Sequence, residues 1–151
     1  MATFPEIAQQ LRATMRNAAD RTHGWDEEYV EQKWRGGERW SRKEIFGHLV
    51  DSAANNHQRF IRAAIAGEYA GPNYQQDAWI AAGAYQDFNW DKLQSLWLTY
   101  NALIAHVLER IPTERAQASC SIGNGDPVTL QFLAEDYVAH LQRHLDQIFQ
   151  R

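Results

Sequence analysis

The chain has 151 residues, 44% of them hydrophobic, and a formal net charge of −4. This length is that of one domain, so we expect a single domain over residues 1–151. The acidic balance argues against nucleic acid as a partner, because phosphate binding needs a basic surface. The single cysteine, Cys120, excludes an internal disulfide, and no segment has transmembrane length. We therefore expect a cytoplasmic protein with no membrane partner.

Two long helices are predicted in the first half of the chain. The first spans about residues 5–21 and begins with a proline, which is favoured in the first helical turn. The second opens at Ser41, and Glu44 follows three residues later in the spacing of a capping box. It continues to about Ala66, where Gly67 supplies a stop.

The second predicted helix has an apolar side and a polar stripe. His57 falls on the apolar side, whereas His48 lies on the polar stripe together with Ser52, Asn55 and Arg59. Periodicity alone would bury His57 and leave His48 facing either water or a polar cleft. The pattern favours the solvated stripe and leaves the cleft open as an alternative.

A long connection separates the second and third helices. Residues 67–88 are too many for a tight turn, and a short helix is expected at residues 77–81. Such a crossover lets consecutive helices of a bundle run in the same direction. The third helix is predicted from an N-cap at Asn89 to Ile111, just before Pro112.

The fourth predicted helix begins after Thr129, and residues 123–126 before it have the composition of a hairpin turn. It carries His140 and His144, which share one face and can reach one metal ion. Two buried imidazoles can equally be core residues bonded to neighbours. A zinc protease is excluded, because Leu141 follows the first histidine where that motif requires glutamate.

Three separated segments resemble the DinB-like superfamily, also called YfiT-like. Residues 40–52 resemble its second-helix signature, and residues 77–93 resemble its crossover and third helix. Residues 135–145 resemble its last helix. The three segments occur in the right order and span most of the chain.

The resemblance implies an all-α fold, a four-helix bundle with long crossover loops. It implies a divalent metal held by His48, His140 and His144, with Zn²⁺, Ni²⁺ and Fe²⁺ not distinguished. It further implies a metal-dependent enzyme acting on a small-molecule substrate, with a low-molecular-weight thiol as a candidate co-substrate and a homodimer as its assembly. The alternative is a non-catalytic helical module whose metal site is structural or vestigial.

Other polar residues follow from their spacing to these histidines. Asp51 lies one turn after His48, and Asp136 lies one turn before His140, so either can accept a hydrogen bond from a ligand's second nitrogen. Asn55 and Arg59 continue the polar stripe and are candidates for binding a substrate carboxylate or amide. A solvated surface is the alternative for all of them. Tyr137 is expected in the core with its hydroxyl at the edge of the cleft.

Overall fold

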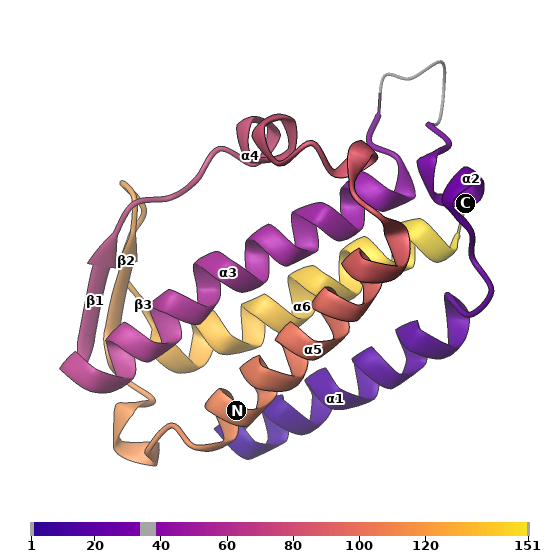
Figure 1. The fold of residues 1–151 in the computed structure, drawn as a ribbon. Coiled ribbons are helices and arrows are strands. Elements are labelled where there is room, and N and C mark those ends of the chain that lie inside the picture. Colours follow the sequence, from indigo (N-terminus) through magenta and orange to yellow (C-terminus); the bar gives the residue numbers. More distant parts are fainter. Residues whose placement is uncertain (1, 34–38, 151) are drawn as a thin grey trace.

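The computed structural model describes residues 2–33 and 39–150, and four long helices dominate it (Figure 1). The four-helix bundle predicted from the sequence is confirmed. Its helices are α1 (Phe4–Arg21), α3 (Arg42–Ala66), α5 (Trp90–Glu109) and α6 (Leu130–Phe149).

Each long helix begins at a side chain that caps it. The four N-cap residues accept a hydrogen bond from a backbone N–H in the first turn, which satisfies a donor that the helix itself cannot pair; they are Thr3, Ser41, Asn89 and Thr129. The predicted capping box of Ser41 and Glu44 is present. Gly67 ends α3 with a φ of 80°, a left-handed conformation that glycine adopts without strain.

The four helices form a bundle in which α1 and α3 each pack against α5 and α6. Helices α3 and α5 run in the same direction, while α1 and α6 run in the opposite one (Figure 1). The connection between α3 and α5 therefore has to return along the bundle. This return carries α4 (Gln76–Gly83) and the 3₁₀ turn η2 (Tyr85–Asp87) over one side of α3.

A small sheet closes the end of the bundle where α3 and α5 finish. It has the order β1 (Glu68–Gly71), β2 (Ser119–Ile122) and β3 (Val128–Thr129). β1 pairs with β2 in parallel, which follows from the shared direction of the helices before them. β2 and β3 form the hairpin expected around residues 123–126. The parallel pairing was not predicted.

Two further short elements complete the described chain. The 3₁₀ turn η3 (Thr113–Arg115) follows α5. Helix α2 (Glu27–Glu31), which the sequence analysis did not predict, lies against the beginning of α3. No helix of the described residues is both long and apolar enough to cross a membrane.

Three residues of the polar stripe of α3 are buried and Asn55 is half-buried, contrary to the solvated face that periodicity favoured. The exposed fractions of His48, Ser52 and Arg59 are 0%, 4% and 7%. The crossover between α3 and α5 covers this side of the helix, which a single-helix pattern cannot reveal. His57 is only half-buried, and its Nδ1 lies 3.0 Å from the hydroxyl of Tyr100 on α5.

The core between the helices contains a polar contact of its own. Tyr137 is buried as expected, but its hydroxyl is not at a cleft edge. It donates to Oδ1 of Asn101, at 2.5 Å, and Asn101 is itself completely buried. The hydroxyl therefore satisfies a core amide.

Candidate metal centre

Three histidines from two antiparallel helices converge at one end of the bundle. His48 comes from the first half of α3, and His140 and His144 come from the second half of α6. Nε2 of His140 lies 3.5 Å from Nε2 of His48 and 3.1 Å from Nε2 of His144. One ligand atom from each ring lies within 4.8 Å of the other two.

These distances fit a shared cation. Zinc–nitrogen bonds of about 2.1 Å place two ligand nitrogens about 3.4 Å apart at a tetrahedral angle and about 3.0 Å apart at a right angle. Both Nε2 separations lie close to this interval. Three nitrogens this close cannot all be paired by protons, whereas a divalent ion is attracted by all three lone pairs. The donor set therefore suits a metal.

The surroundings keep the three imidazoles neutral. Burial, followed by the neighbouring rings of His144 and His140, lowers the pKa of His48 to about 3. Burial, then His140 and Arg143, lowers the pKa of His144 to about 4. The pKa of His140 is also lowered, mainly by burial. At neutral pH the rings thus have lone pairs free for a metal, since only the unprotonated ring is a ligand.

The second nitrogens of two rings lack partners. Nδ1 of His48 and Nδ1 of His144 are buried, and neither has a hydrogen-bond partner among the described residues. The acceptor role expected of Asp51 and Asp136 is therefore not seen for these two atoms. Asp136 is exposed and acts on His140 only through its charge, which raises the pKa of that ring.

Asp51 instead receives a hydrogen bond from the crossover. The hydroxyl of Tyr85 donates to Oδ1 of Asp51 at 2.5 Å, and the other carboxylate oxygen is buried without a partner in the described structure. The ring of Tyr85 lies directly on Gly47, where a Cβ atom would stand 2.2 Å from Cδ2 of the ring. Only glycine at position 47 allows this approach. Burial raises the pKa of Asp51, an effect that the hydrogen bond from Tyr85 partly offsets.

The sequence analysis did not single out Tyr85, although one signal was available. A glycine inside a helix costs about 1 kcal/mol relative to alanine, so Gly47 beside His48 indicates a close approach by another group. The sequence of α3 does not show which group approaches Gly47. Tyr85 is identified only once the position of the crossover over α3 is known.

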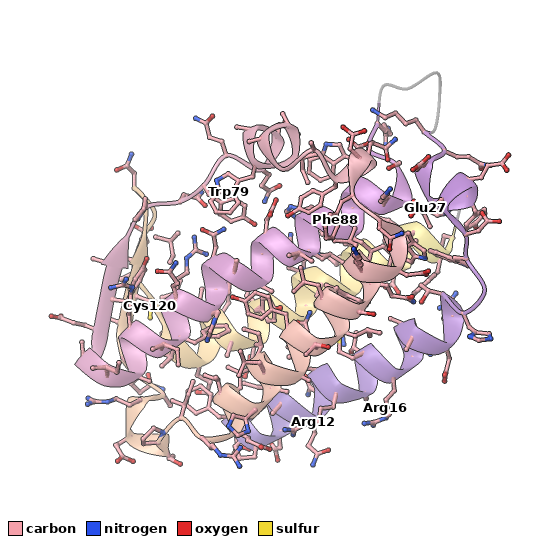
Figure 2. All side chains as sticks on the ribbon, in the orientation of Figure 1. Arg12, Arg16, Glu27, Trp79, Phe88 and Cys120 are labelled. Carbon is pink, nitrogen blue, oxygen red and sulfur yellow. The ribbon has the colours of Figure 1, made fainter. Side chains whose placement is uncertain are left out.

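A buried lysine fixes the start of α3, about one and a half turns before His48. Nζ of Lys43 lies 2.8 Å from Glu27 and 3.1 Å from Glu31, both on α2, and it donates to the carbonyl of Gln86 at 3.0 Å. Figure 2 shows Glu27 beside this end of α3. The ring of Trp40 also packs on His48, with centroids 5.2 Å apart. These contacts hold His48 in one place.

The structure does not bring Asn55 and Arg59 to the histidine cluster. At 1.5 Å per residue they lie about 10 Å and about 16 Å beyond His48 along α3. Both instead line a cavity of about 710 Å³ between the second half of α3 and strands β1 and β2. Their predicted contact with substrate remains a prediction.

Comparison with known proteins supports the fold. No protein-family model matches the chain, and no curated protein sequence matches it. Among solved structures, YfiT from Bacillus subtilis is similar over 97% of this chain and 82% of that chain, with a TM-score of 0.79 and 17% sequence identity. YfiT is described as a probable metal-dependent hydrolase with an unusual four-helix bundle topology. The YfiT-like bundle expected from the sequence is thereby confirmed, since likeness at this identity establishes the fold.

Proposed function

We propose that the chain is a metal-dependent enzyme that acts on a small electrophilic molecule, with His48, His140 and His144 as the protein ligands of a divalent cation. The observation that carries the proposal is the convergence of three buried or half-buried Nε2 atoms within reach of one ion. The description of YfiT as a probable metal-dependent hydrolase supports it from a protein of the same fold.

Three protein ligands are characteristic of catalytic rather than structural zinc sites, which use four. Within the described residues, the cluster of potential ligands contains three histidines and no cysteine or carboxylate. A divalent cation held in this way supplies Lewis-acid chemistry and lowers the pKa of a water or thiol beside it.

The protein's own contribution is to keep the ligands neutral and fixed. Burial holds the imidazoles of His48 and His144 unprotonated at neutral pH. The packing of Trp40 on His48 and the Lys43 network limit movement of the first turns of α3. A nucleophile formed at the site would act either as water, giving hydrolysis, or as a low-molecular-weight thiol, giving transfer.

The first experiment is elemental analysis of untagged protein. The parent should carry about one equivalent of Zn, Ni or Fe per chain, because three buried imidazoles converge on one point. His144→Ala should lose most of it. His57→Ala is the matched control, since His57 lies on α3 outside the cluster and bonds Tyr100 instead; its metal content should equal the parent's.

Turnover then separates the two chemistries. Activated esters and epoxides should be consumed by the loaded parent and not by His144→Ala. Products that carry the added thiol indicate transfer, and products that carry water indicate hydrolysis. A folded parent that refuses added Zn²⁺ and Ni²⁺ would overturn the metal site. A loaded parent that is inert with every substrate class, and that loses only thermal stability on chelation, would instead establish the non-catalytic alternative.

A further inference from the structure

The cavity beside the small sheet presents an arginine that lacks an acidic partner. Arg59 is 7% exposed, yet none of the described Asp or Glu side chains forms a salt bridge with it. Its hydrogen bond among the described residues runs from Nη2 to the carbonyl of Pro72 at 3.5 Å, the outer limit for such a contact. A guanidinium has five donors, so most of this group is unused.

The unused donors open onto the cavity. Among the described side chains, no nitrogen of Arg59 is sealed from solvent without a partner, and Arg59 lines the cavity. A cationic group covered by protein but reachable from a cavity is costly unless an anion or water satisfies it. The volume of about 710 Å³ lies within the range typical of small-molecule sites.

Two further charged side chains, the exposed Arg62 and Glu68, lie in the wall, and its other groups are neutral and well suited to an organic ligand. Asn55 uses its amide nitrogen to donate to the carbonyl of Asp51, which leaves its side-chain oxygen as an acceptor. Ser119 and Ser121 on β2 add hydroxyl groups, while Tyr69 and Pro72 add apolar surface. The lining therefore offers one main anion receptor together with hydrogen-bonding and apolar contacts.

We propose that this cavity binds a small organic carboxylate, which pairs with the guanidinium of Arg59. The planar fork of arginine matches the two oxygens of a carboxylate. A phosphate dianion fits less well, because Arg59 is the buried cation of the lining, Arg62 is exposed and bonded to Gln58, and Glu68 would repel the larger charge. The site is separate from the histidine cluster by two to three turns of α3 and stands whether or not the cluster holds a metal.

The test is a titration of ¹⁵N-labelled protein, as purified, followed by amide chemical shifts. The probes are N-acetylglycine, its neutral carboxamide and inorganic phosphate at equal ionic strength. N-acetylglycine should shift resonances of residues 55–62, 68–71 and 119–121 with millimolar affinity. The carboxamide should bind at least about 5-fold more weakly, because it lacks the charge that Arg59 receives.

Variants assign the effect to Arg59. Arg59→Lys keeps the charge and loses the fork, so affinity for N-acetylglycine should fall about 5-fold. Arg16→Lys is the matched control on the outer side of α1 and should bind as the parent does (Figure 2). If Arg59→Lys does not fold, the proposal is tested by comparing the affinities of the parent protein for N-acetylglycine and for its carboxamide.

Equal binding of acid and carboxamide, shifts confined to other regions, or tighter binding of phosphate would each overturn the proposal. Because the readout is amide shifts rather than turnover or metal content, its failure is distinguishable from failure of the metal centre.

Discussion

The two halves of α3 differ in how completely the rest of the protein surrounds them. Every residue from Arg42 to Ala53 is buried, although this half carries three charged side chains at its start and both His48 and Asp51 within it. In the second half, Ile61 and Ile65 are 36% and 75% exposed, and the polar residues line an open cavity. The first half of α3 thus buries even its polar side chains, whereas the second half leaves some hydrophobic side chains exposed.

This contrast indicates where the fold has accepted an energetic cost. Burying imidazole and carboxylate groups without full hydrogen bonding is unfavourable, and a cation at the three rings would offset the cost for the histidines. The second half makes a smaller demand, because Asn56 is hydrogen-bonded within the helix and Arg59 opens onto the cavity. We therefore expect metal binding and protonation to change the stability of the first half of α3, which carries His48, strongly. They should change the stability of the second half, which lies beside the small sheet, only weakly.

The largest expected effect is acid destabilisation of the chelated protein. The pKa of His48 falls from 6.5 to about 3 on folding, and that of His144 falls to about 4. Between these pKa values the unfolded chain binds protons that the folded chain does not bind. The free energy of unfolding is therefore highest above pH 7 and decreases as the pH falls from 6.5 towards 3. The two shifts set an upper bound of about 8 kcal/mol on this loss. Urea unfolding of metal-free protein should show a loss on the order of half that bound, because His144 is only half-buried.

Two variants assign this slope to the cluster. His144→Leu removes a titrating ring and should flatten the dependence between pH 6.5 and pH 4. His23→Leu, in the turn after α1, should leave it as in the parent. Equal slopes in parent and His144→Leu would contradict the assignment.

The next effect concerns Gly47 and Tyr85. Gly47→Ala places a Cβ 2.2 Å from the ring of Tyr85, so the ring must move and its hydrogen bond to Asp51 is strained or lost. We expect a loss of about 2 kcal/mol in thermal or urea unfolding, as for other overpacked sites.

The sign should reverse when the ring is absent. In a Tyr85→Ala background the same Gly47→Ala change meets no ring, and alanine is the better helix former by up to about 1 kcal/mol. A double-mutant cycle measures this coupling. A loss of similar size in both backgrounds would show that Gly47 is required for some reason other than Tyr85.

The contrast between the halves also explains what could be predicted from the sequence. Caps, stops and apolar periodicity are local, so the helices beginning after Ser41, Asn89 and Thr129 were placed within a residue or two. His140 and His144 share one helix, and their proximity was a matter of spacing. The choice of His48 over His57 was not local: periodicity alone favoured burying His57, and only the resemblance to a family pointed to His48.

The remaining features depend on contacts between segments far apart in sequence. The crossover turns an apparently solvated stripe into a buried one and brings Tyr85 to Asp51 across 34 positions. The parallel pairing of β1 with β2 depends on α3 and α5 ending at the same place. The cavity that contains Asn55 and Arg59 exists only because this sheet stands beside α3. None of these has a signal in a single helix or strand.

The smallest expected effect lies at the sheet end and tests whether the two halves are independent. Nε of Arg115 donates to the carbonyl of Ala64 at 3.0 Å, and its Nη2 lies 3.4 Å from the carbonyl of Ile65, so this side chain satisfies the last turn of α3. Arg115→Gln should lower the free energy of unfolding by about 1 kcal/mol and speed amide exchange near Gly67.

The control Arg110→Gln alters an exposed side chain bonded mainly within its own helix and should cost less than about 0.5 kcal/mol. Metal content should match the parent's in both variants, because the histidines lie at the far end of the bundle. A drop in metal content in Arg115→Gln would mean that fraying of the last turn reaches His48, and the two halves would then have to be treated as one cooperative unit.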